Sequence, residues 1–416
     1  MNELSVNSKK YRFDKFIFKM ILIRSFCQLL FTYRLFPNTV LNVISAFILV
    51  IVVLQLQKSK ASSLFPKGLF LYWILFGYAA FSIYLNGFSL KGFSDLFSYF
   101  FYYIIACYYA TRLDQLSFAF FKEQFAQFLK IFFFVLCIQV PLAYAGLGDK
   151  STTGSVFGHA NSANLFLSFL ILLNIEKLKF HIIGLLFILM IVLGGRTSLI
   201  ASTIIVIAVF AVDRVKVKAI KNLIVAASAY CLYYIYAALI ALADKTDWND
   251  KVKIGGSSGF GDMSLDSLKW RLQNWSYYLK DLNSRDTILF GKGIGSYINV
   301  SPHYYDQFFE VHNDFLKIAY DLGVVGLFLF LIADISLGVF FAKKSKNKGY
   351  LIALVYLLRY SFMFFDNLVT NFLGTVVFVG FLYYVAAKSK EVKIVKPKVD
   401  VYPFPIQAKK TFNIMG

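Results

Sequence analysis

Long runs of apolar residues separated by short polar segments dominate the chain from residue 14 to residue 387. Several of these runs approach the roughly 20 residues that an α-helix needs to cross a bilayer. The pattern predicts an all-α, polytopic membrane protein with about twelve transmembrane helices, all in one integral membrane domain at residues 1–387. The predicted spans are 14–36, 38–56, 66–86, 93–111, 124–146, 159–175, 180–194, 197–212, 222–243, 312–342, 350–366 and 369–387.

One segment, residues 244–311, interrupts this pattern with polar, glycine-rich and aromatic sequence. Within it, residues 264–282 carry apolar and aromatic side chains at helical spacing, which predicts a short amphipathic helix. Tryptophans such as Trp270 and Trp275 favour the headgroup level of a bilayer, so we expect this helix to lie on the membrane surface. The glycines of residues 289–295 predict a tight turn after the helix.

The composition supports the membrane class. The chain is 58% hydrophobic and 19% aromatic, whereas a soluble domain averages about 45–50% apolar residues. Its net charge of +20 would suit a nucleic-acid-binding protein, but the placement of the charges argues against that class.

The basic residues define a topology. They collect in the two tails and in every second loop, whereas residues 244–311 are nearly neutral. By the positive-inside rule, both termini are cytoplasmic and residues 244–311 form one large external loop. Residues 388–416 are basic and contain three prolines, which predicts a disordered cytoplasmic tail with some affinity for anionic lipid. No small-residue cleavage site follows the first apolar segment, so we expect no removable signal peptide.

The most informative polar residues are His312, Asn313 and Asp314, between the external loop and the apolar run 312–342. A histidine at this water–lipid boundary can take or give a proton near neutral pH beside a lipid-carried substrate. Asn313 or Asp314 is expected to cap the following helix by accepting hydrogen bonds from its free N–H groups. A cap does not account for His312, which is either a catalytic residue or an ordinary interfacial side chain.

Two arginines are candidates for binding an anion. Arg196 follows two glycines at the predicted start of the span 197–212, where its guanidinium and the free N–H groups of the helix could hold phosphate oxygens. The alternative for Arg196 is an arginine that snorkels to the interface. Arg271 lies in the predicted amphipathic helix, where it caps an anionic headgroup or pairs with an acid of the loop.

Two further charged residues lie inside predicted spans. Arg359 is an intramembrane charge, which marks a functional candidate, and Asp366 is its expected partner. Lys317 is expected to form local ion pairs with Asp314 and Asp321, three residues before it and four residues after it.

The remaining polar motifs carry less information. His159 and Asn161 open one predicted span and are expected to face the same external vestibule as His312. Residues 291–295 resemble a dinucleotide-binding fingerprint only superficially, because no strand precedes them. No Asp-x-Asp pair occurs, so we expect neither the metal site typical of nucleotide-sugar enzymes nor a cofactor.

Three sequence blocks, taken in order, resemble the bacterial family of O-antigen polymerases and O-antigen ligases. The third block is the most specific, and the chain departs from the family pattern at Gly195, which takes the place of a serine before the arginine. The resemblance covers residues 190–340. The blocks are Gly194–Ser198, Arg271–Gly295 and His312–Gly326.

The resemblance implies an integral-membrane glycosyltransferase of O-antigen, lipopolysaccharide or capsular polysaccharide biosynthesis, using a glycan linked to undecaprenyl diphosphate. It implies an active site at the periplasmic face of the bacterial inner membrane. Arg196 and Arg271 would bind the diphosphate and stabilise its growing charge, and His312 would orient or deprotonate the acceptor hydroxyl. The displacement would invert the anomeric centre without a metal, so we expect activity to persist in a chelator.

The sequence leaves three functions open. The leading hypothesis is a polymerase that joins lipid-linked repeat units, with a chain-length regulator as a further partner. The second is a ligase that transfers the glycan to lipid A–core from the same donor. A transporter would need paired intramembrane charges and broken central helices; from the sequence only Arg359 lies deep, which disfavours transport.

Overall fold

The computed structural model describes residues 11–32, 38–59, 69–87, 89–113, 118–145, 160–175, 180–193, 196–244, 266–299, 311–345, 348–366, 368–369 and 371–391. All regular structure in these segments is helical, which confirms the all-α prediction. The helices are α2 (Arg12–Thr32), α3 (Asn38–Ser59), α4 (Leu71–Asn86), α5 (Leu90–Arg112), α6 (Phe118–Tyr144), α7 (Ala160–Ile175), α8 (Phe180–Leu193), α9 (Arg196–Arg214), α10 (Lys218–Asp244), α11 (Asp266–Asp281), α12 (Arg285–Phe290), the 3-10 helix η4 (Ser296–Asn299), α13 (Asp314–Lys344), α14 (Gly349–Phe365) and α15 (Phe372–Glu391).

Every predicted span is occupied by one of these helices, with boundaries that differ by a few residues. Within the segments above, five helices are long and apolar enough to cross a membrane, namely α3, α6, α10, α13 and α15. Shorter apolar helices lie in α4, α7, α8 and α14. The chain is thus a multi-pass membrane protein, and the crossing of all twelve helices stays a prediction.

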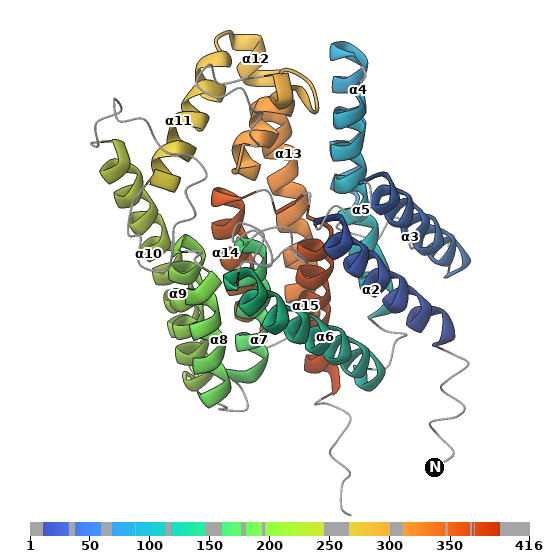
Figure 1. Cartoon of the computed structure of the whole chain (residues 1–416), viewed down its shortest axis with the longest axis vertical. Helices are drawn as coiled ribbons and strands as arrows, with labels where there is room; N and C mark the ends of the chain where they lie inside the picture. Colours follow the sequence, from blue (N-terminus) through green and yellow to red (C-terminus); the bar gives the residue numbers. More distant parts are fainter. Residues whose placement is uncertain are drawn as a thin grey trace, which may run out of the picture.

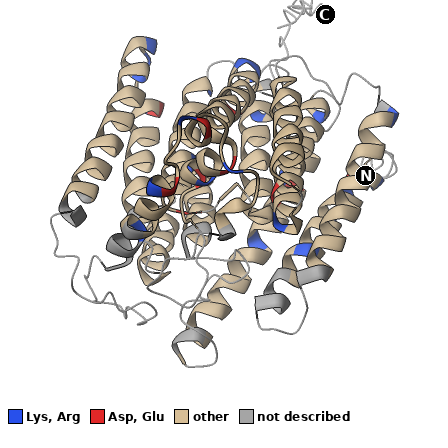
Figure 2. Cartoon of the chain, turned by 90° about the horizontal axis from the view of Figure 1, so that it is seen from above, with Lys and Arg blue, Asp and Glu red and all other residues tan. Residues whose placement is uncertain are grey.

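Helix α13 is the central element and packs against α4, α12, α14 and α15 (Figure 1). Its first turns lie with α11 and α12 at the upper end of Figure 1, and it descends toward the end at which α15 finishes. Figure 2 shows Lys, Arg, Asp and Glu mainly at helix ends and at a few interior points. The outer helix surfaces expose large apolar side chains such as Phe47 and Leu54 of α3, as a bilayer-facing surface requires.

Helix α13 is broken at Gly323, where φ is 71° and ψ is −179°. This region of backbone space is open essentially to glycine alone. The break frees preceding carbonyl groups from their helical partners. The N–H groups of Lys292 and Gly293 donate to the carbonyls of Tyr320 and Asp321, both at 2.9 Å. The glycine-rich turn predicted from the sequence therefore completes the hydrogen bonding of a broken helix.

Gly323→Ala is expected to destabilise the protein by at least about 1–3 kcal/mol, the cost of a non-glycine residue in this conformation. A Cβ atom there would also lie 2.1 Å from the Leu289 carbonyl oxygen, which is backbone and cannot move aside easily. The measurement is the thermal unfolding midpoint in detergent. Gly77→Ala is the matched control, because a Cβ at Gly77 meets no atom within 4 Å. Equal midpoints for the two variants would contradict the assigned role of Gly323.

The predicted amphipathic helix is present as α11, but its aromatic face packs against the protein. Trp275 and Tyr278 are buried in a cluster with Tyr297, Tyr320 and Phe365. The expectation of a side chain at the membrane surface is therefore wrong for Trp275, and Tyr278 of the same helix is buried with it. Large aromatic side chains gain most from being removed from water, and here α13 and the end of α14 supply the contact.

The predicted basic tail begins later than the sequence suggested. Helix α15 continues to Glu391, so residues 388–391 are helical. Residues 392–416 lie outside the described segments, as do residues 245–265 and 300–310 of the predicted external loop. The division into a membrane domain, an external loop and a cytoplasmic tail stays a prediction.

Candidate active site

His312 lies immediately before α13 with its backbone in the left-handed region. Its φ is 49°, and it is the one non-glycine residue with positive φ in the part of the chain that the structure describes. This conformation costs on the order of 1–3 kcal/mol, so neighbouring contacts must hold it. One of them is the predicted helix cap: the Asn313 side chain accepts a hydrogen bond from the Leu316 N–H at 2.9 Å.

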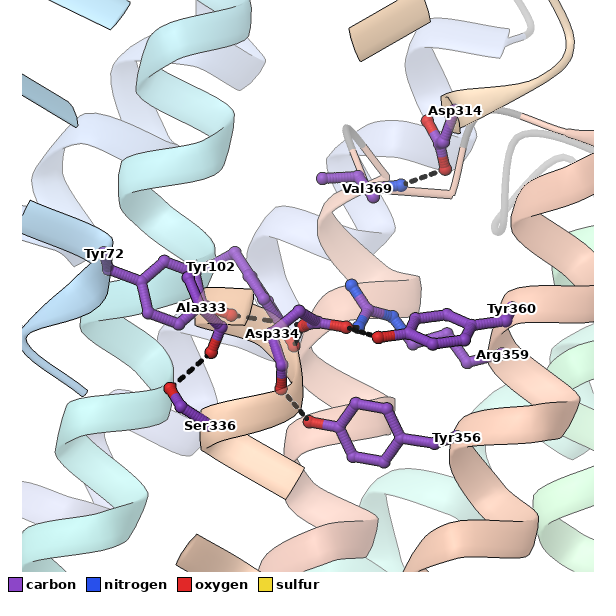
Figure 3. Close-up of polar contacts among 10 residues, drawn as sticks. All are labelled: Tyr72, Tyr102, Asp314, Ala333, Asp334, Ser336, Tyr356, Arg359, Tyr360 and Val369. Atoms are coloured by element: carbon purple, nitrogen blue, oxygen red, sulfur yellow. Dashed lines mark hydrogen bonds and ion pairs between the residues drawn. The ribbon is translucent and has the colours of Figure 1, made fainter. Parts of the chain in front are cut away.

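Asp314 joins the start of α13 to the connection between α14 and α15. Its side chain is fully buried, and Oδ2 accepts hydrogen bonds from the N–H groups of Leu368 and Val369 at 2.7 and 2.9 Å. Figure 3 shows the contact with Val369. Asp314 therefore anchors the segment that follows α14 beside the segment that carries His312.

His312 faces a buried carboxylate. Its Nδ1 lies 3.4 Å from Oδ1 of Asp366, the residue that ends α14. The Asp366 side chain is 4% exposed and the imidazole is 18% exposed. A carboxylate in this position can fix the orientation and tautomer of the ring. The contact is long for a hydrogen bond, which is common at catalytic sites before substrate binds.

The charge of Asp366 also acts on Arg271 of α11. Burial lowers the pKa of the Arg271 guanidinium, and the negative charge of Asp366 opposes that shift. An arginine still keeps its charge under these conditions. Asp366 thus links two of the three predicted site residues: its carboxylate contacts His312, and its charge acts on Arg271.

Arg359 does not belong to this group, and its predicted pairing with Asp366 is wrong. Its Nη1 lies 2.7 Å from both carboxylate oxygens of Asp334 in α13, and both side chains are buried. Asp366 has an extended backbone beyond the end of α14, which directs it to His312 instead. The same Asp334 carboxylate also accepts hydrogen bonds from the hydroxyls of Tyr72, Tyr102 and Tyr360 (Figure 3).

Lys317 has a partner that its position in the sequence did not reveal. Its Nζ lies 3.0 Å from Oδ2 of Asp95 in α5, with both side chains 2% exposed, and 4.5 Å from the ring centroid of Tyr297. The charge of Lys317 also acts on Asp314 and Asp321, so the prediction of a local ion-pair set was incomplete. The ion pair holds the first half of α13 against α5.

Three predicted site residues are not placed in full. Arg196 begins α9 and Asn161 lies in α7, but their side chains are outside the described part of the structure. His159 lies outside the described residues altogether. The convergence of Arg196 on His312 and Arg271 therefore stays a prediction.

Sequence reasoning missed two acidic residues. Asp334 is the one charged residue in the apolar run 322–342, which by itself marks an intramembrane site. Asp366 was noted only as a partner for Arg359. Asp366 lies seven residues beyond Arg359, but α14 ends at Phe365, so Asp366 does not continue the helix that carries Arg359.

The arrangement combines a buried guanidinium with a histidine that faces a carboxylate, at one end of an all-helical bundle. Such a group of residues can bind a phosphate and accept a proton from a hydroxyl beside it. Fold and site together define a multi-pass membrane protein with a candidate site that joins a histidine, a carboxylate and an arginine.

Comparison with known proteins shows which family part of the chain resembles. Residues 181–331 match a protein-family model described as O-Antigen ligase. The match includes Arg196, Arg271 and His312 and extends to the middle of α13. The match confirms the resemblance of this segment to O-antigen polymerases and ligases. No curated protein matches the chain.

Proposed function

We propose that the protein is a membrane glycosyltransferase that uses a glycan carried on undecaprenyl diphosphate at the periplasmic face of the inner membrane. The observation that supports this most strongly is that Asp366 contacts His312 and acts through its charge on Arg271, and that His312 and Arg271 both lie in the family-matched segment. The donor is anionic and the acceptor is a hydroxyl, and these residues offer a guanidinium for the first and an imidazole for the second.

The proposed reaction is a single displacement. His312 takes the proton of the acceptor hydroxyl while that oxygen forms a bond to the anomeric carbon. The bond between this carbon and the diphosphate oxygen breaks, and the electron pair leaves with the diphosphate. Arg271, joined by Arg196, stabilises the charge that develops on the leaving group. Asp366 stabilises the protonated His312 until it releases the proton to water.

A polymerase is the leading form of this proposal. It joins the glycan of one lipid-linked repeat unit to another, and O-antigen or capsular polysaccharide is the product. A ligase that transfers the glycan to lipid A–core is the second candidate, because the matching family model is described as O-Antigen ligase. Both reactions use the same donor and the same three residues.

The sequence argument against transport does not hold in the structure. Two buried ion pairs, Arg359–Asp334 and Lys317–Asp95, are present, and the central helix α13 is broken at Gly323. These features are also typical of transporters. The proposal of a transferase therefore depends on the family match and on the acid–base site.

A reconstituted assay tests the function. The purified protein in liposomes receives the undecaprenyl-diphosphate-linked repeat unit of its source organism, with and without lipid A–core, in the presence of a chelator. A ladder of longer lipid-linked glycans without lipid A–core supports the polymerase. A product that requires lipid A–core supports the ligase. The absence of any glycosidic product, also with Mg²⁺ or Mn²⁺ restored, would refute a transferase.

Arg271→Lys is expected to lower turnover by about 10²–10³-fold, the usual effect of losing one donor to a developing anion. Lysine keeps the charge but loses the fork of donors that matches phosphate oxygens. Arg285→Lys, at an exposed position at the start of α12, is the matched control. Turnover is measured in the same liposomes, and equal rates for the two variants would remove Arg271 from the site.

A further inference from the structure

Helix α11 presents two residues to the candidate site from one face. Arg271 and Trp275 are four residues apart, a spacing that places side chains on the same side of a helix. Arg271 lies near Asp366, and Nε1 of Trp275 donates a hydrogen bond to the Val311 carbonyl at 2.8 Å. One helix therefore carries a charge that interacts with the carboxylate facing His312, and an indole that is hydrogen-bonded to the peptide group directly before His312.

The hydrogen bond from Trp275 to the Val311 carbonyl restrains the strained backbone at His312. Relaxing the φ of 49° at His312 would rotate the peptide group between Val311 and His312. That rotation would pull the Val311 carbonyl away from the indole and leave it buried without this donor. Val311 itself is fully buried in the aromatic cluster of Trp275, so the side chain resists the same movement.

We infer that Trp275 is a positioning residue: its indole N–H fixes the peptide before His312 and so directs the imidazole toward Asp366. The inference rests on the proposed function, because the direction of the imidazole matters to the reaction only if His312 acts on the acceptor. It assigns Trp275 an internal hydrogen-bonding role that differs from the interfacial role expected from its residue type.

Trp275→Phe tests the inference, because phenylalanine keeps an aromatic ring in the cluster and removes the N–H. Turnover is expected to fall about tenfold, the effect of about one hydrogen bond on the barrier, with the donor KM within about twofold of wild type. The second readout is the rate at which diethylpyrocarbonate modifies His312, measured by mass spectrometry relative to the rate for the exposed His181 of α8. In Trp275→Phe this relative rate is expected to rise several-fold.

Trp73→Phe is the matched control. Trp73 lies in α4, in an aromatic cluster with Phe76, Phe100 and Tyr103, and is expected to change neither readout. If Trp275→Phe does not fold, 3-benzothienylalanine at position 275 replaces it, since sulfur takes the place of the N–H in a ring of nearly the same outline.

The two readouts separate the possible failures. An unchanged modification rate at His312 overturns the inference, whatever the turnover. A faster modification rate with wild-type turnover also overturns it, because the direction of the imidazole would then not limit the reaction. Equal effects in Trp73→Phe would show a general packing effect and overturn it as well. Wild-type activity in a His312→Asn variant would instead refute the proposed role of His312. The modification rate of His312 in Trp275→Phe would still show whether Trp275 fixes the direction of the imidazole.

Discussion

His312→Asn is expected to reduce glycan transfer by about 10²–10⁴-fold, the usual contribution of a general acid–base residue. Asparagine is chosen because it tolerates the left-handed backbone that His312 adopts, so the chain can keep its path while the imidazole is lost. Asparagine cannot take the acceptor proton, and the buried carboxylate of Asp366 would face an amide instead of a ring that can become positive.

The measurement is the rate of transfer in liposomes at equal amounts of folded protein. His181→Asn is the matched control, because His181 is exposed on α8. Its rate is expected to stay at the wild-type value. If the His312→Asn variant transfers glycan at the rate of the control, His312 is an ordinary interfacial histidine. The proposed role of His312 as the general base would then be refuted.

Asp334→Asn is expected to destabilise the protein by about 3–5 kcal/mol, the cost of breaking a buried ion pair from one side. The substitution keeps the shape of the side chain but leaves the buried Arg359 guanidinium without its counter-charge. It also weakens the acceptor of three hydroxyl groups, from Tyr72 of α4, Tyr102 of α5 and Tyr360 of α14. Because these contacts connect four helices, including α13, the loss is expected to affect the whole bundle.

Thermal and denaturant unfolding in detergent measure this effect. Asp213→Asn is the matched control: Asp213 also accepts a hydrogen bond from a tyrosine hydroxyl, that of Tyr350, but at an exposed position where water replaces the contact at little cost. Arg359→Met is expected to cost less than Asp334→Asn, because Asp334 keeps its tyrosine donors. If Asp334→Asn unfolds like the control, the buried pair does not hold the bundle together.

The sequence by itself determined the helices and pointed to the residues of the candidate site. A run of apolar residues forms a helix in a membrane wherever it occurs, because the backbone must satisfy its own hydrogen bonds there. The cap at Asn313, the amphipathic pattern of α11 and the glycine-rich turn are likewise local properties. His312 and Arg271 stood out because each is polar at the edge of apolar sequence.

Only the tertiary structure decided which charged groups meet. Asp334 and Arg359 lie 25 residues apart and His312 and Asp366 lie 54 apart, and helical spacing gives neighbours only within one helix. The glycine-rich turn supplies hydrogen-bond donors to α13 because that helix breaks at Gly323, and the sequence does not show this contact. Each buried charge or freed carbonyl needs a partner, but the sequence does not show which one, since that choice depends on how the helices pack against one another.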